Sequence, residues 1–161
     1  MTIHTSIDPC IRAEMGKWLK MDFEFSHFVT LATNDAGLSP ATMRRRLKSW
    51  DARVNRALYG PKWQKHQDEL IWFFAFLEKP SANPHWHLML RIVGRWNEDP
   101  VSTYSEFHRA AFIGWKQLMP SGTIDVQAIR AGYSSVEEYV LKELRGAIQY
   151  SSFVTPDELR H

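Results

Sequence analysis

Residues 71–93 read IWFFAFLEKPSANPHWHLMLRIV, and this stretch decides the fold. Two apolar, aromatic-rich runs flank the six residues KPSANP, a connection that favours a β-hairpin between residues 71–78 and 85–93. Residues two positions apart point to the same face of a strand. Closing the hairpin with Glu78 opposite His85 therefore predicts one face that is almost wholly apolar, and a second face that holds Glu78, His85 and His87.

That second face has the composition of a metal site. Two imidazoles and a carboxylate give three ligands and leave open positions, which suits Mg²⁺ or Mn²⁺ bound jointly with a phosphate, or Zn²⁺ with a reactive water. The competing interpretation is that one histidine belongs to the core while the other is merely exposed. Glu78 and the apolar flanks favour the metal site, and the open positions indicate catalysis rather than a structural role.

The segments before the hairpin predict one strand and two helices. Residues 27–33 (HFVTLAT) are β-branched and aromatic and precede a turn-prone stretch, as expected of a strand. Ser39-Pro40 supplies an N-cap and a first-turn proline for an amphipathic helix that ends at Gly60-Pro61. A short helix is expected over residues 9–19.

The segments after the hairpin predict a helix, a strand and a final helix. Apolar residues spaced three and four apart place a helix over residues 103–118, and residues 123–129 follow as a strand. Capping-box spacing at Ser135 opens a helix that reaches about residue 146. The predicted fold is α+β, a ferredoxin/RRM-like βαββαβ antiparallel sheet with two helices on one face and additional N- and C-terminal helices.

Composition limits the chain to a single compact domain. It has 161 residues, 44% of them hydrophobic, and a formal net charge of +2, so we expect one domain over residues 1–161 with its core at about 23–147. The one cysteine, Cys10, excludes a disulfide framework and a multi-cysteine zinc site and favours a reducing compartment. No stretch resembles a membrane span or a signal peptide, so we expect a cytoplasmic protein without a membrane partner.

Residues 139–143 (YVLKE) predict a nucleophile on the last helix. Tyr139 and Lys142 are three apart and share a helix face, and Glu143 follows as an additional candidate. A tyrosine that attacks phosphorus needs a metal to polarise the phosphate and a nearby cation, both of which this sequence supplies. By themselves, a core-edge tyrosine and a solvated lysine would explain the pattern. Tyr133 and Tyr150 are alternative nucleophiles.

In its order of motifs the chain resembles the HUH endonucleases, and among them the rolling-circle replication initiator (Rep) proteins. The resemblance rests on residues 27–34 as the first motif, on His85-Trp86-His87 as the metal motif and on residues 139–143 as the nucleophile motif. It covers about residues 23–147. The last two motifs are specific in combination, whereas the first is weak by itself.

The resemblance implies a metal-dependent nickase and strand transferase that acts on single-stranded DNA at an origin or hairpin. Tyr139 would form a 5′-phosphotyrosyl link and leave a free 3′-OH, Glu78 would be the third metal ligand, and Mn²⁺ or Mg²⁺ would be the cofactor. The motif has one tyrosine rather than a pair, so a single-tyrosine cycle is expected. A separate helicase would unwind the DNA, because the chain has no room for one.

DNA contacts are expected from the first motif, at Thr30 and Asn34, and from the start of the long helix. Arg44, Arg45 and Arg46 would bind phosphate there without reading sequence, although such a run is also typical of a solvated helix face.

Three other functions fit parts of the sequence. Small single-tyrosine transposases of the insertion-sequence type share the size and the His-x-His pattern, but more often carry glutamine where this chain has Lys142. A non-enzymatic RNA-recognition-type module shares the predicted order of elements and would stack bases on Phe74, Phe76 and Trp86. That module gives no reason for the metal-type cluster. A structural protein is disfavoured because the clustered polar groups are costly to bury without a ligand.

Overall fold

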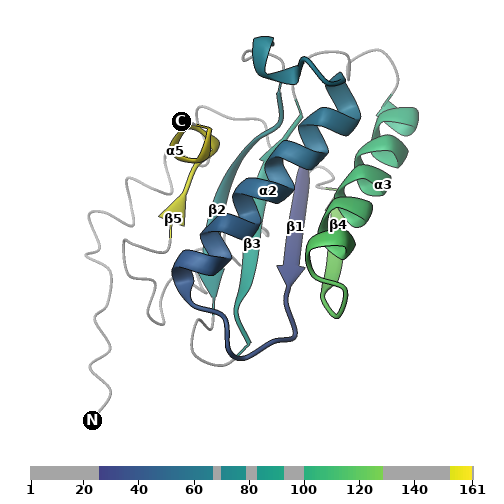
Figure 1. The fold of residues 1–161 in the computed structure, drawn as a ribbon. Helices are drawn as coiled ribbons and strands as arrows, with labels where there is room; N and C mark the ends of the chain where they lie inside the picture. The colour runs from purple at the N-terminus through teal and green to yellow at the C-terminus, as the bar shows by residue number, and fades with distance from the viewer. Residues whose placement is uncertain (1–25, 67–69, 79–82, 93–99, 129–152, 161) are drawn as a thin grey trace, which may run out of the picture.

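The computed structural model describes residues 26–66, 70–78, 83–92, 100–128 and 153–160. Within these residues the chain forms a five-stranded antiparallel sheet of order β4-β1-β3-β2-β5, with helices on one face (Figure 1), which confirms the α+β class. The elements are β1 (His27–Ala32), α2 (Pro40–Tyr59), the 3₁₀ turn η1 (Trp63–Lys65), β2 (Trp72–Glu78), β3 (His85–Arg91), α3 (Pro100–Leu118), β4 (Thr123–Ala128), β5 (Phe153–Val154) and α5 (Pro156–Leu159).

The hairpin of β2 and β3 has the predicted register. Glu78 pairs with His85 and Phe76 with His87, so alternate residues divide between the two faces as expected. β2 begins at Trp72, one residue later than predicted, because the backbone N–H and carbonyl of Ile71 form hydrogen bonds with side chains and not with a neighbouring strand. Its N–H donates to Asn55 Oδ1 and its carbonyl accepts from the Arg160 guanidinium. β3 ends at Arg91, two residues earlier than predicted.

Both predicted ends of α2 are confirmed. The Ser39 hydroxyl accepts a hydrogen bond from the Thr42 N–H at 3.2 Å, and Pro40 occupies the first turn, where no N–H is needed. Gly60 ends the helix at a φ of 89°, a conformation that side chains rarely adopt, and its N–H donates to the Arg56 carbonyl.

α3 begins at Pro100, three residues before the predicted start, because a proline fits the first turn of a helix. Phe107, Ala111 and Trp115 are fully buried, as their spacing predicts. Gly122 lies in the turn after α3, and a Cβ atom there would lie 2.6 Å from the Ala32 carbonyl oxygen. The turn can therefore approach the end of β1 only because residue 122 has no side chain.

Three buried indoles fix the helices to each other and to the sheet. Trp50 on α2 donates to the Ala111 carbonyl on α3, Trp86 on β3 donates to the Met43 carbonyl on α2, and Trp115 on α3 donates to the Ala32 carbonyl on β1. A buried indole N–H without a partner would cost free energy, so these bonds permit three large side chains in one small core.

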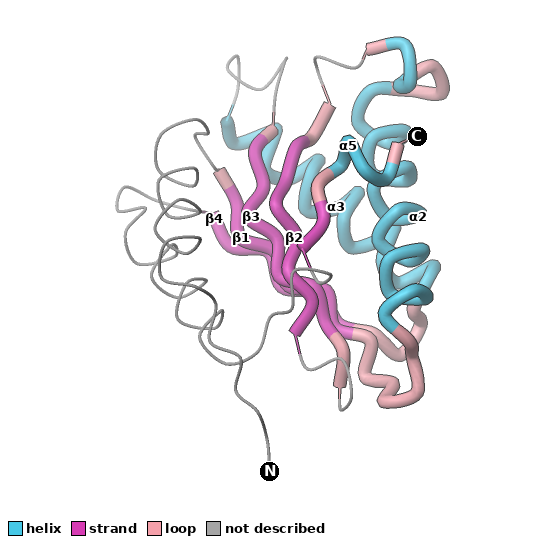
Figure 2. The backbone as a smooth tube through the Cα atoms, turned by 90° about the vertical axis from the view of Figure 1, so that its left-hand side faces the viewer, coloured by secondary structure: helices cyan, strands magenta, loops and turns pink. Residues whose placement is uncertain are grey.

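The C-terminal segment adds elements that the sequence did not predict. β5 pairs with the outer edge of β2, and α5 follows it on the helix side of the sheet, as the view across the sheet in Figure 2 shows. Arg160 donates to both carboxylate oxygens of Asp51 on α2, at 2.8 and 3.0 Å. Burial raises the pKa of Asp51, whereas Arg160 and Asn55 act in the opposite direction by hydrogen bonding to its charged form.

Two predicted helices, over residues 9–19 and 135–146, lie outside the described residues. Among the helices that the structure describes, none combines the length and the apolar character needed to cross a bilayer.

Candidate metal centre

β2 and β3 bring Glu78, His85 and His87 together on the face of the sheet opposite to α2 and α3. One ligand atom from each side chain lies within 4.8 Å of the other two. The Nε2 atom of His85 is 2.8 Å from Glu78 Oε2, and the Nε2 atom of His87 contacts the same oxygen. The two rings are nearly perpendicular, at 83°, with centroids 4.7 Å apart. The three groups therefore converge on one point, as the sequence predicted.

The remaining nitrogen of His85 indicates what this point can hold. His85 Nδ1 lies 2.8 Å from the Asn83 backbone carbonyl, which only accepts hydrogen bonds, so Nδ1 carries a proton. In a neutral ring, Nε2 then presents a lone pair to a carboxylate oxygen, a contact that is favourable only with a cation or a proton between them. Two protonated rings at this separation would repel each other, whereas one metal ion satisfies all three groups. The donor set therefore fits a divalent cation.

β1 supports His87 from the neighbouring strand. Thr30 pairs with His87 across the sheet, and its hydroxyl lies 3.1 Å from His87 Nδ1. The Phe28 ring, two residues earlier on the same face, stacks on the imidazole at 5.6 Å with an angle of 15°. A second ring nitrogen held by a hydrogen bond is typical of metal-ligating histidines, because it fixes the tautomer and the orientation of the ring.

The segment that precedes His85 is held by the turn after β1. The Asn34 N–H donates to the Asn83 side-chain oxygen at 3.2 Å, and the buried Thr33 hydroxyl donates to the Pro84 carbonyl at 3.1 Å. Asn34 has a φ of 54°, in the left-handed region that asparagine tolerates. Because Asn83 supplies the carbonyl that orients His85, Asn34 supports that histidine through one intermediate residue.

The cluster is only partly enclosed. The side chains of Glu78 and His85 are 18% and 14% exposed, and that of His87 is 9% exposed. Three protein ligands leave positions for water or for a phosphate oxygen. The arrangement is therefore suited to polarising a bound phosphate, and it also suits a Zn²⁺-bound water.

The predicted DNA-binding arginines lie at the start of α2. Arg44 and Arg45 are exposed and Arg46 is half-buried. The start of α2 follows the end of β1, and Ala32 there pairs with His85, so these arginines belong to the same end of the sheet as the cluster.

The candidate nucleophile and its neighbours, Tyr139, Lys142 and Glu143, lie outside the described residues, as do Tyr133 and Tyr150.

Thr33, Asn83 and Phe28 contribute to the site although the sequence reasoning did not assign them a role. Thr30 and Asn34 were expected to contact DNA, and the structure also gives them hydrogen bonds that support the cluster. The signal was present in the stretch TLATN, whose polar residues interrupt an apolar strand. The hydrogen-bond partner of each of these polar residues depends on the register between β1 and β3.

The chain matches no protein-family model, no curated protein and no solved structure.

Proposed function

We propose that this chain is a metal-dependent endonuclease of the HUH type, which nicks single-stranded DNA and initiates rolling-circle replication. The observation that carries the proposal is the convergence of His85, His87 and Glu78 Oε2 on one point, with both Nδ1 atoms held by hydrogen bonds. A ferredoxin-like core is part of the proposal. It is supported by the order β4-β1-β3-β2 with α2 and α3 on one face.

The proposed cleavage uses two groups of residues, the cluster of Glu78, His85 and His87 and the motif at residues 139–143. A divalent ion, Mn²⁺ or Mg²⁺, bound by the cluster would draw charge from a non-bridging phosphate oxygen. The Tyr139 hydroxyl loses its proton to water and its oxygen attacks phosphorus, the bond to the 3′ oxygen breaks, and that oxygen takes a proton from water and leaves as a 3′-OH. Lys142 offsets the charge of the phosphate. The roles of Tyr139, Lys142 and Glu143 rest on the resemblance of residues 139–143 to the nucleophile motif.

The cations at the start of α2 suit a strand that leaves the cluster at that end of the sheet. Arg44, Arg45 and Arg46 would hold its phosphates, with affinity falling as salt rises. Thr30 and Asn34 precede this helix start in the sequence and contact the residues around the cluster, so we retain them as DNA contacts in addition to their supporting hydrogen bonds. A separate helicase supplies the unwinding in this scheme.

The non-enzymatic module is less well supported. Such a module stacks bases on exposed aromatic side chains of its sheet. Here Phe74 and Phe76 are only 3% and 2% exposed, and Trp86 lies in the core beneath α2. The insertion-sequence type of transposase would use the same cluster and the same transesterification, and it differs in its DNA substrate.

The test uses the full chain, Mn²⁺ and a fluorescent pool of single-stranded oligonucleotides that includes hairpins. We expect a covalent protein–DNA adduct on a denaturing gel, reduced at least about 10³-fold in Tyr139→Phe because the nucleophile is lost. Tyr59→Phe, a change on α2, is the matched control and should keep the adduct.

A second experiment tests whether formation of the adduct requires the metal. EDTA, or His87→Ala, should abolish the adduct while DNA retention in a filter assay persists. An adduct that survives in Tyr139→Phe and disappears in Tyr133→Phe or Tyr150→Phe would reassign the nucleophile. Binding without an adduct under either Mn²⁺ or Mg²⁺ would contradict the proposal and favour the binding module.

A further inference from the structure

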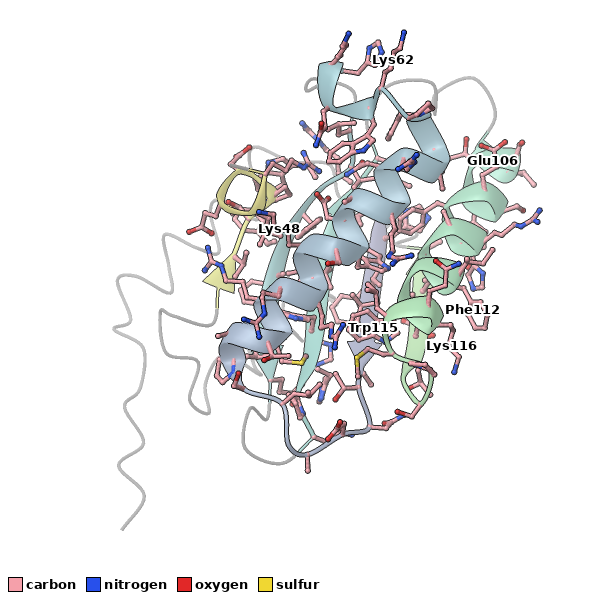
Figure 3. The ribbon with its side chains drawn as sticks, viewed as in Figure 1. Lys48, Lys62, Glu106, Phe112, Trp115 and Lys116 are labelled. Carbon is pink, nitrogen blue, oxygen red and sulfur yellow. The ribbon has the colours of Figure 1, made fainter. Side chains whose placement is uncertain are left out.

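A groove runs between the outward faces of α2 and α3, on the side of the molecule opposite to the metal centre. Its volume is about 650 Å³, and its walls come from residues 53–58 of α2 and residues 106–117 of α3. Figure 3 looks onto the two helices, with Trp115 between them and with Phe112 and Lys116 on the side of α3 turned away from α2.

The lining of the groove carries a net positive charge. Arg53 and Arg56 come from α2 and Arg109 from α3, whereas Glu106 is the one acidic residue of the lining. Within the described parts of the chain, the guanidinium groups of Arg56 and Arg109 have no hydrogen-bond or ion-pair partner. Arg53 donates to the neutral Gln117 amide oxygen at 2.6 Å and so keeps its charge. Cations gathered in a groove repel each other and attract an anionic partner.

The same groove has an apolar floor. Ala57 and Ala110 are small, which lets a side chain from outside approach the helix backbones, and Gly114 faces Arg53 and Trp50 of α2. Ile113 in the lining is a large apolar residue that is 43% exposed. An exposed large apolar side chain in a groove rimmed by charge is typical of surfaces that bind protein.

We propose that this groove binds an acidic segment of a partner protein. An aliphatic or aromatic side chain of that segment lies on the floor beside Ile113, and flanking Asp or Glu residues pair with Arg56 and Arg109. A planar guanidinium binds a carboxylate through two parallel hydrogen bonds. A nucleic-acid backbone fits less well, because it has no apolar group for the floor and the Glu106 carboxylate would repel it. The inference does not rest on the proposed function, since the groove and the metal centre occupy opposite faces.

The test selects peptides from a display library on the full chain and measures the affinity of the enriched peptides by fluorescence anisotropy. We expect enriched peptides to carry at least two acidic residues around one apolar residue. Arg56→Glu combined with Arg109→Glu should weaken their binding about tenfold or more, because the rim charges are reversed. Lys62→Glu combined with Lys65→Glu makes the same charge change on exposed residues outside the groove and should leave binding unchanged.

The floor is tested separately. Ile113→Ser should also weaken binding, whereas Val101→Ser, a change at a residue that is 78% exposed and outside the lining, should not. Circular dichroism checks that each variant is folded. No enrichment, or equal binding to the Arg56/Arg109 variant, would overturn the proposal. So would a 12-mer duplex DNA that binds in place of the peptides and is lost with the same charge reversal, or a dimer of the chain in light scattering that the reversal disrupts.

Discussion

Thr30 is the residue on which the orientation of His87 depends. Its hydroxyl is a hydrogen-bond partner of Nδ1, and this contact holds the ring in the orientation in which Nε2 faces Glu78. A side chain of the same shape without the hydroxyl would remove this hydrogen bond and hold the ring less firmly in that orientation. Thr30 is therefore a positioning residue for the metal centre.

Thr30→Val is expected to weaken Mn²⁺ binding about 10- to 100-fold, the usual cost of removing an outer hydrogen bond from a ligating histidine. Isothermal titration calorimetry measures the affinity without any DNA. Thr123→Val on β4 is the matched control, because Thr123 is exposed and has no hydrogen bond to either histidine. An unchanged affinity in Thr30→Val would show that Phe28 stacking alone orients the ring.

His27 makes the stability of the fold depend on pH. It lies on the helix face of β1, stacked on Tyr104 and in contact with the Phe107 ring, and burial lowers its pKa from 6.5 to about 4. Below pH 6.5 the unfolded chain binds a proton at this ring that the folded chain does not bind until about pH 4. The contribution of His27 to the free energy of unfolding is therefore fully present above pH 6.5 and is lost as the pH falls towards 4.

The lost stability amounts to about 3 kcal/mol by linkage between the two pKa values. His27→Phe keeps a ring in the same place without the titration, so its free energy of unfolding should fall less than that of the unaltered chain between about pH 7 and about pH 4. Urea denaturation at both values measures the difference. The same change at the exposed His108 is the control, and equal pH dependence in all three proteins would contradict the assignment.

At the scale of elements, Arg160 and Asp51 attach the C-terminal segment to α2. The carboxylate is 1% exposed, and Arg160 also donates to the Ile71 carbonyl at the start of β2. One guanidinium therefore connects α5, α2 and β2. Removing it leaves a buried carboxylate whose remaining hydrogen bond comes from the Asn55 amide.

Arg160→Met is expected to lower the free energy of unfolding by about 3 kcal/mol, since an unpaired buried charge is costly. The double change Arg160→Met with Asp51→Leu should recover most of the loss, because replacing both partners by apolar groups removes the desolvation cost. Urea denaturation measures each variant. A single variant as stable as the unaltered chain would mean that the ion pair does not hold the segment in place.

The hairpin and α2 could be predicted because their signals are local. Six residues between two apolar runs set the register of β2 and β3, and Ser39 and Gly60 mark both ends of the helix. The convergence of Glu78, His85 and His87 could be predicted for the same reason, since all three residues belong to this one hairpin.

Other features depend on contacts between distant segments. β5 has two residues, too few to show a periodicity, and Arg160 reaches Asp51 across 109 positions. Thr30 and His87 are 57 positions apart, and a shift of one residue between β1 and β3 would have placed Thr30 on the core face. No local pattern specifies that register, so the supporting hydrogen bonds of the cluster could not be assigned from the sequence.

At the scale of the whole molecule, the sheet separates two surfaces of different chemistry. One face carries Glu78, His85 and His87, and the helices on the other face form the arginine-lined groove. A ligand bound on one face of the sheet does not obstruct the site on the other face. The two proposals are therefore compatible, because a nucleic-acid strand on one face would leave the groove on the other face free for a protein segment.

β1 lies between β3 and β4, yet both of these neighbours come later in the chain. The first strand of the sheet thus has no described partner until residues 85–91 have been made, and its second edge is covered only when β4 arrives. Long loops must close before these contacts contribute, which slows folding relative to a chain with local contacts. The hairpin can therefore bring Glu78, His85 and His87 together before β1 pairs, whereas the support that Thr30 and Phe28 give His87 is complete only once β1 has paired with β3.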